Sequence, residues 1–219
     1  TSNLPEPAVK PAENFNTVIY TGNATARSIT GVGFQPDWVW IKNRAATENH
    51  TIYDVLRGAE IRLASDANDG EDDRGSYGLT AFGADGFTIG TGGELNGNNQ
   101  AIVAWNWKAG GSGSANNDGD NNATVSANTD AKFSIVSYTG SGGEPKTVAH
   151  GLGVSPEMVI IKKRNDAGSW VVWHKDLADN YAFEGLDTTG AAVSGGSPIS
   201  KYVDAVSSTL VTLGDASEN

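Results

Sequence analysis

The sequence predicts an all-β fold made of two tandem β-sandwich or jelly-roll-like units with long glycine-rich loops. Three observations support this. Short apolar runs alternate with clusters of Gly, Asn, Asp and Ser, helical periodicity is scarce, and one set of motifs occurs twice. The 28 glycines fall between the apolar runs rather than in a regular triplet, which is typical of turns and not of a collagen-like chain.

Eight segments have the clearest strand character. They are Thr17–Thr21, Trp38–Lys42, Gly86–Gly90, Ala101–Trp107, Phe133–Tyr138, Met158–Lys162, Ser169–His174 and Thr209–Leu213. The best candidate for a helix is Asp54–Ala64, although Gly58 weakens it.

The repeat is carried by three motifs that keep their order in both halves. In the first half they are Y-T-G at Tyr20–Gly22, G-x-G-x-x-P at Gly31–Pro36 and V-x-I-K-x-R at Val39–Arg44. In the second half they are Tyr138–Gly140, Gly151–Pro156 and Val159–Arg164. A later run, Phe87–Gly90, matches Val211–Gly214. The ordered agreement indicates a duplication.

The repeat and the local composition divide the chain into four segments. They are an extended arm with three prolines at 1–15, a first β-unit at 16–108, a linker of Gly, Ser, Asn and Asp at 109–122, and a second β-unit at 123–219. The linker has no apolar side chain larger than alanine, so we expect a flexible coil.

The second unit has no counterpart of the strand Ala101–Trp107, because the sequence stops at Asn219, shortly after the matching Gly214. A missing central strand would leave a sheet edge and a core face open. We expect that this chain is a piece of a longer protein. The alternative is that another chain supplies the strand.

The formal net charge of -11 disfavours nucleic acid as a partner, because an acidic chain repels phosphate backbones. No apolar run approaches the roughly 20 residues that span a bilayer, so we expect no membrane insertion. The chain has no cysteine, which excludes disulfides and thiolate chemistry. The sequence has no pair of histidines at zinc-helix spacing, no nucleophile elbow and no phosphate-binding loop. We therefore predict no catalytic residue and no cofactor.

Tryptophans are the first candidates for ligand contacts. Trp170 and Trp173 lie three residues apart on a predicted strand, so they point to opposite faces and one should be exposed. An exposed tryptophan is suited to a partner or a sugar ring. Trp38 and Trp40 are assigned to packing between layers, because the second unit has Met and Ile at the matching positions.

A cationic pair recurs in both units, as Lys42 with Arg44 and as Lys162 with Arg164. Each pair lies on one strand face and could bind a carboxylate or an acidic glycan. The alternative, which we favour in so acidic a chain, is pairing with nearby Asp or Glu at the sheet edge.

Two acidic loops could hold Ca²⁺, through Asp66 and Asn68 or through Asp118 and Asp120. The first loop departs from the EF-hand order, because Gly70 stands at position five, where Asp or Asn is needed. Each loop could form a flexible cage of oxygen ligands around Ca²⁺, or it could be a solvated loop without a metal.

Several runs resemble a repeat module of virion proteins from tailed, often marine, bacteriophages. They are Tyr20–Asn23, Ile29–Arg44, Asp85–Gly90, Val103–Gly111, Phe133–Gly140 and His150–Arg164. The resemblance extends from about Leu4 to Leu213. It implies a tail-fibre, appendage or capsid-decoration protein on the exterior of the virion, assembled with other virion subunits as a homo-oligomer and able to contact a host-surface glycan.

The chain departs from that family in two places. Members often carry Cys where this chain has Asn106, and they usually complete the second copy with a final strand. The resemblance implies a non-enzymatic structural or adhesion role and supplies no catalytic residue. Two other functions stay open: a concanavalin-like carbohydrate-binding module, and a polysaccharide-degrading enzyme with two carboxylates in a cleft.

Overall fold

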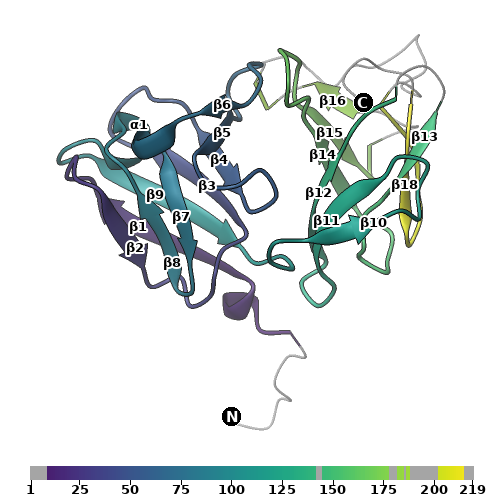
Figure 1. Ribbon diagram of the computed structural model, residues 1–219, viewed down its shortest axis with the longest axis horizontal. Helices are drawn as coiled ribbons and strands as arrows, with labels where there is room; N and C mark the ends of the chain where they lie inside the picture. The colour runs from purple at the N-terminus through teal and green to yellow at the C-terminus, as the bar shows by residue number, and fades with distance from the viewer. Residues whose placement is uncertain (1–8, 142–144, 178–181, 185, 188–201, 215–219) are drawn as a thin grey trace, which may run out of the picture.

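A computed structural model of the chain describes residues 9–141, 145–177, 182–184, 186–187 and 202–214. Antiparallel strands dominate these residues, and they form two groups of sheets that lie side by side (Figure 1). The prediction of an all-β fold is confirmed. No helix in the described part of the chain is long and apolar enough to cross a membrane.

The first unit contains two sheets. Its strands are β1 (Phe15–Thr21), β2 (Arg27–Thr30), β3 (Trp38–Asn43), β4 (Thr51–Asp54), β5 (Ile61–Ala64), β6 (Asp72–Asp73), β7 (Leu79–Gly83), β8 (Gly86–Ile89) and β9 (Ala101–Trp107). The larger sheet has the order β1-β9-β3-β4-β5-β6 and the smaller one β2-β8-β7. Three short helical segments accompany them: η1 (Pro11–Glu13) precedes β1, while η2 (Gly75–Tyr77) and α1 (Gly93–Asn96) connect strands.

The core of the first unit lies between these two sheets. Side chains alternate along each strand, so Val39 and Ile41 of β3 point inward together with Ile102 of β9. They meet Phe87 and Ile89 of β8 in one buried cluster. The opposite face of the larger sheet carries tryptophans, and this face is turned toward the second unit.

The repeated G-x-G motif forms a tight turn that brings an apolar residue into the core. Gly31 and Gly33 have φ of 90° and 88°, a region that L side chains avoid, while Val32 between them is fully buried. The Asp85 carboxylate accepts hydrogen bonds from both glycine N–H groups, at 3.1 and 2.6 Å. The glycines at the ends of Gly151–Gly153 repeat the conformation, each at φ 71°.

The second unit contains smaller sheets. Its strands are β10 (Ser114–Asn116), β11 (Ala123–Asn128), β12 (Phe133–Tyr138), β13 (Lys146–Ala149), β14 (Met158–Ile161), β15 (Val171–His174), β16 (Ala182–Glu184), β17 (Val203–Val206) and β18 (Leu210–Leu213). They form three sheets, β10-β11-β12, β14-β15-β16 and β13-β18-β17.

The two units share their strand pairings in the same register. Trp38 pairs with Asp54 in the first unit, and the residues 120 positions later, Met158 and His174, pair in the second. The pairs β4–β5 and β15–β16 keep the same offset. Even the irregularity between Leu79 and Ala81 recurs, between residues 203 and 205.

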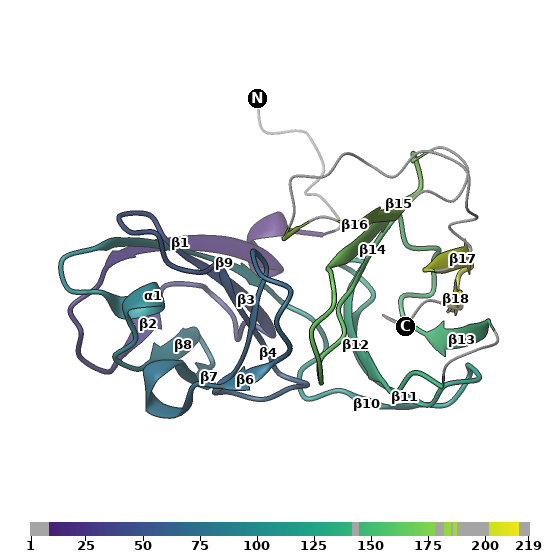
Figure 2. The ribbon, with the colours of Figure 1, turned by 90° about the horizontal axis from the view of Figure 1, so that it is seen from above.

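The units differ in several places: β6 has no described counterpart in the second unit, β10 and β11 have none in the first, and a further difference concerns β9. In the first unit β9 lies between β1 and β3 and is hydrogen-bonded to both. The strands that match β1 and β3 in the second unit are β12 and β14, and no described strand joins them. Strands β12 and β14 consequently belong to separate sheets (Figure 2).

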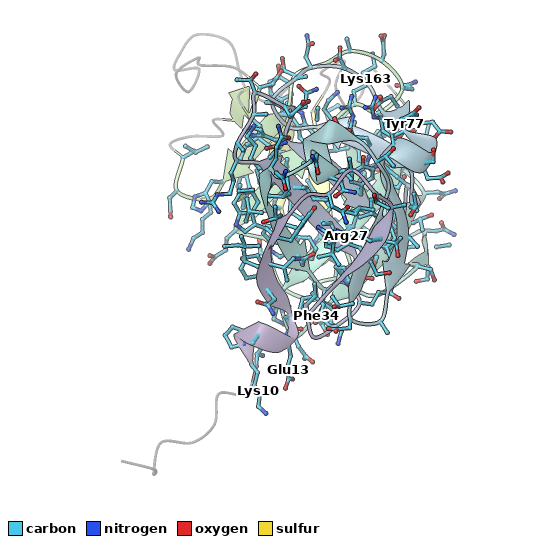
Figure 3. The ribbon with its side chains drawn as sticks, turned by 90° about the vertical axis from the view of Figure 1, so that its left-hand side faces the viewer. Lys10, Glu13, Arg27, Phe34, Tyr77 and Lys163 are labelled. Atoms are coloured by element: carbon cyan, nitrogen blue, oxygen red, sulfur yellow. The ribbon has the colours of Figure 1, made fainter. Side chains whose placement is uncertain are left out.

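Two sequence predictions are corrected here. Asp54–Ala64 is not a helix: Gly58, at φ 95°, lies in a turn that leads into strand β5. The linker 109–122 is not a flexible coil, because it contributes β10, which pairs with β11. Of the N-terminal arm, residues 1–8 lie outside the described residues. The remainder contains η1 and reaches Phe15, the first residue of β1. The labelled Lys10 and Glu13 mark where η1 projects from the first unit (Figure 3).

Candidate functional site

The two units meet around Trp170, which precedes β15. Its side chain is only 4% exposed and packs in one cluster with Ile52 and Leu63 on the outer face of the first unit's larger sheet. The indole N–H donates to the carbonyl oxygens of Ala64 and Ala67, at 2.9 and 3.1 Å. The prediction of an exposed ligand platform is therefore wrong for Trp170, because that sheet face is apolar and has to be covered.

Trp173 lies on the other side of β15. It is half-buried and packs against the core cluster of the second unit, opposite Val159 in the strand register. The two indoles do point to opposite faces, as their spacing predicted. The structure assigns one of them to the contact between the units and the other to the core of the second unit.

The tryptophans of the larger sheet complete the contact. Trp38 and Trp40 are half-buried on its outer face, and Trp107 lies next to Trp38 at 4.6 Å between ring centroids. Phe133 of β12 stacks on Trp107 at 6.2 Å and lies 5.9 Å from Trp38. Trp38 and Trp40 thus pack between the two units rather than between the two sheets of one sandwich.

An ion pair ties the second unit to the acidic loop of the first. The Arg164 guanidinium binds both carboxylate oxygens of Glu71, at 2.8 and 3.1 Å, and donates to Ser137 Oγ at 2.7 Å. The same two residues are also joined through their backbones, since Glu71 N–H donates to the Arg164 carbonyl at 2.7 Å. Gly70 permits this approach, because a Cβ there would lie 2.8 Å from that carbonyl oxygen.

Lys162 contacts the same loop. Its ammonium donates to the Asn68 carbonyl at 3.3 Å, and Gly168 N–H donates to that same oxygen at 2.8 Å. Burial lowers the pKa of Lys162, and the carboxylates of Asp187 and Asp69 act in the opposite direction. One predicted cationic pair and one predicted acidic loop are thus brought together, from opposite halves of the chain.

The first-unit cationic pair has a different environment. The Lys42 ammonium donates to the Glu48 carbonyl at 2.7 Å. Arg44 is exposed, and its backbone N–H donates to the Ala101 carbonyl of β9 at 2.8 Å. The prediction that these cations pair with carboxylates at the sheet edge is confirmed for Arg164. For Lys42 the described partner is a backbone carbonyl.

The four candidate metal ligands all contact other groups of the protein, Asn68 through the carbonyl oxygen described above. Asp66 accepts the His50 N–H at 2.8 Å, and Asp118 N–H donates to the Asn116 side chain at 3.0 Å. Asp120 accepts from the N–H and the hydroxyl of Thr147, and these bonds lower the pKa of its carboxyl. Within the described ranges, no group of three or more His, Asp or Glu side chains comes together as a metal site.

Asp37 is a structural residue that sequence reasoning missed. It is 2% exposed, and its carboxylate accepts N–H groups of Ala109 and Gly111 at 2.8 and 3.1 Å and the Gln35 amide at 3.1 Å. It thereby fixes the start of the linker on the first unit. The sequence signal was one of position: the linker follows β9 directly, and Asp37 directly precedes β3, the strand that pairs with β9.

A second missed feature is an ionic network inside the first unit. Glu94 of α1 is buried and binds Arg62 at 2.6 Å and Arg74 at 3.2 Å, while Asp72 binds Arg62 at 2.9 Å. The network holds α1 against β5 and β6. It satisfies the charges that this part of the fold buries.

A cavity of about 900 Å³ lies between the two units and extends toward the core of the second unit. Its first-unit wall includes Trp38, Trp40 and Trp107. Its second-unit wall contains β12, β14 and, beyond them, the core residues Val148, Val211 and Leu213. The core of the second unit is therefore open to this cavity.

His150 borders the cavity and gives the chain a pH dependence. Its Nδ1 accepts the Leu152 N–H at 3.3 Å, so the proton of the neutral ring is on Nε2, which faces the Ser207 carbonyl at 3.2 Å. Burial lowers the pKa of His150, and the Ser207 bond acts in the opposite direction. The folded chain therefore favours the neutral ring.

We expect this histidine to stabilise the fold fully above about pH 6.5, its ordinary pKa when unfolded. Its contribution is lost as the pH falls through the lower folded-state pKa. The urea midpoint should fall more between pH 7.5 and 5.5 in the unsubstituted chain than in His150→Gln. Equal slopes in the two proteins would contradict this assignment.

Comparison with known proteins places the chain in a family. It matches no curated protein and no solved structure. A domain of unknown function, DUF7483, matches residues 10–219, which includes both units and the linker. Because the match covers nearly the whole sequence, the chain belongs to the DUF7483 family.

Proposed function

We propose that this chain is a non-enzymatic structural or adhesion protein on the exterior of a bacteriophage particle, as a tail fibre, an appendage or a capsid decoration. The observation that supports this best is that residues predicted to bind a ligand instead hold the two units together. Trp170, Lys162 and Arg164 join the two units, and their polar atoms contact the first unit. Such a joined two-unit body suits a part of a larger assembly.

Two further features agree with this proposal. The sequence motifs resemble virion repeat modules, and the net charge of -11 favours a soluble exterior protein that avoids the nucleic acid inside the particle. The partners in this proposal are other virion subunits in a homo-oligomer, with a host-surface glycan as a further contact for an adhesion role.

The alternative functions have weaker support. A carbohydrate-binding module would need an accessible indole, and Trp170 is buried at the contact between the units. A polysaccharide-degrading enzyme would need two free carboxylates in a cleft. On the cavity wall, Asp54 is ion-paired with Arg57 at 2.5 Å and Glu157 with Lys175 at 3.0 Å.

The direct test is the composition of purified particles of a phage that encodes the chain. We expect the chain to co-sediment with intact particles through a density gradient and to remain after a high-salt wash. Antibody labelling in electron microscopy would then separate tail fibre from capsid decoration, and antibody block of adsorption would identify an adhesion role. A chain found only in the soluble fraction of the lysate would contradict the proposal.

A further inference from the structure

We propose that the gap between β12 and β14 is a strand-binding slot. Its occupant is an extended segment of another polypeptide, which pairs antiparallel to both strands and closes the second unit. That the donor is a separate polypeptide rests on the assembly role proposed above. The slot itself rests on four observations of this chain.

The first observation is the agreement between the units. The pairings β2–β8, β7–β8, β3–β4 and β4–β5 all recur in the second unit in the same register. The pairings of β9 with β1 and β3 have no described counterpart, and neither has the pairing of β5 with the short edge strand β6. The second unit therefore keeps the frame of the first and lacks its central strand within the described residues.

The second observation is the direction of the backbone groups on β14. Lys175 N–H donates to the Glu157 carbonyl, so Glu157 faces the β15 side. The backbone N–H and C=O groups of successive residues point alternately to the two edges of a strand. Those of Met158 and Ile160 therefore point to the opposite edge of β14, toward β12. At the matching positions of β3 they bind β9, as the bond from Arg44 N–H to the Ala101 carbonyl shows.

The third observation is the cavity that borders the gap. Val136 and Tyr138 line it from β12 and Ile161 from β14, and core residues of the β13–β18 pair lie behind them. In the first unit, the space between the matching strands is filled by the buried side chains of β9. An apolar cavity that reaches a core is the space that an inserted strand would fill.

The fourth observation is a side-chain contact across the gap. Arg164, just beyond β14, reaches Ser137 of β12 with its guanidinium, at 2.7 Å. Strands on either side of one intervening strand lie roughly 10 Å apart, a distance that a single arginine side chain can largely span. The exposed Arg44 is the matching residue in the first unit, where β9 occupies this space.

The register of β9 defines the chemistry of the occupant. Ala104 lies between Val18 and Ile41, and the matching residues of the slot are Val136 and Ile161. A small apolar residue is therefore expected at the centre of the bound strand. Residues two positions to either side also point into the core, and the intervening residues face the tryptophans of the first unit. Proline is excluded from the centre, because both backbone edges are paired there.

A peptide of residues Asn99–Ala109, which contains β9, is the probe for the slot. We expect saturable binding of the fluorescent peptide to the intact chain, with slower hydrogen exchange at the amides of Met158 and Ile160. The same peptide with Ala104→Pro should bind at least ten times more weakly, because it cannot donate from its centre. Equal binding of both peptides would overturn the proposal.

A pair of proline variants tests the position. Ile160→Pro removes an N–H that faces the slot and no bond to β15, so the protein should fold and lose the peptide. Ile19→Pro is the matched control. Gly22 N–H donates to the carbonyl of Gln100, the residue before β9. Backbone N–H groups alternate between the two edges of a strand, so Ile19, an odd number of positions from Gly22, has its N–H on the outer edge of β1. This variant should keep the affinity of the unsubstituted chain.

Near-ultraviolet circular dichroism of both variants establishes that they fold. Unchanged peptide affinity in a folded Ile160→Pro variant would overturn the slot. Amides of Met158 and Ile160 that are already protected without peptide would show that another segment of the same chain occupies the gap, which also overturns it. These measurements use the isolated chain, so they do not depend on whether the chain co-purifies with phage particles.

Discussion

Trp170→Ala is expected to lower the free energy of unfolding by about 3–5 kcal/mol. The substitution removes the buried indole that covers Ile52 and Leu63, together with the N–H that it donates to the carbonyl groups of Ala64 and Ala67. Urea unfolding followed by far-ultraviolet circular dichroism measures the effect. The unfolding transition should also become less cooperative, since one of the apolar contacts between the two units is lost.

Two variants act as controls for this result. Trp170→Phe keeps most of the packing but not the indole N–H, so it should cost about 1–3 kcal/mol. Tyr77→Ala removes an aromatic ring that is 61% exposed at the surface of the first unit (Figure 3), and its effect should stay within about 0.5 kcal/mol. A Trp170→Ala chain as stable as Tyr77→Ala would contradict the buried contact.

Asp37→Ala is expected to lower the free energy of unfolding by about 2–4 kcal/mol. The carboxylate is the acceptor for the N–H groups of Ala109 and Gly111, and each buried donor left unpaired costs about 1–3 kcal/mol. The start of the linker should also detach from the first unit. Limited proteolysis within residues 109–122 is therefore expected to accelerate in the variant.

The second unit offers a matched control for Asp37. Glu157 follows the proline of the repeated motif in the same way, but its side chain is 70% exposed in its ion pair with Lys175. Glu157→Ala should therefore cost less than about 1 kcal/mol and leave the linker uncleaved. Similar losses for the two variants would contradict the anchoring role of Asp37.

The sequence predicted the fold class and most strand positions, because alternation and turn residues are local signals. The eight segments predicted as strands coincide with β1, β3, β8, β9, β12, β14, β15 and β18. The repeat also indicated that the two units share their strand pairings, and the register agreement between β3–β4 and β14–β15 shows this.

Predictions failed where distant segments decide the local conformation. The linker 109–122 reads as a coil by composition, yet Asp37 and the neighbouring strand β11 give its backbone partners. The segment Asp54–Ala64 has apolar points that suit a helix. Its Asp54 instead binds Arg57 across a turn, and β5 pairs with β4.

The contact between the units was the least predictable part. Glu71 and Arg164 are 93 positions apart, and Trp170 donates to a carbonyl 106 positions away, so no local pattern links them. One signal did exist, since an acidic loop and a repeated cationic pair are complementary in charge. Sequence reasoning weighed them separately, as a Ca²⁺ loop and an anion site, and the fold brings them together.

The most direct test of the account is a reconstruction of the assembled particle at a resolution that separates strands. We expect a strand between β12 and β14, antiparallel to both, with a small residue between Val136 and Ile161 and with its chain traced to a neighbouring polypeptide. A gap that stays empty in the assembled particle, or that is filled by a segment of the same chain, would contradict it.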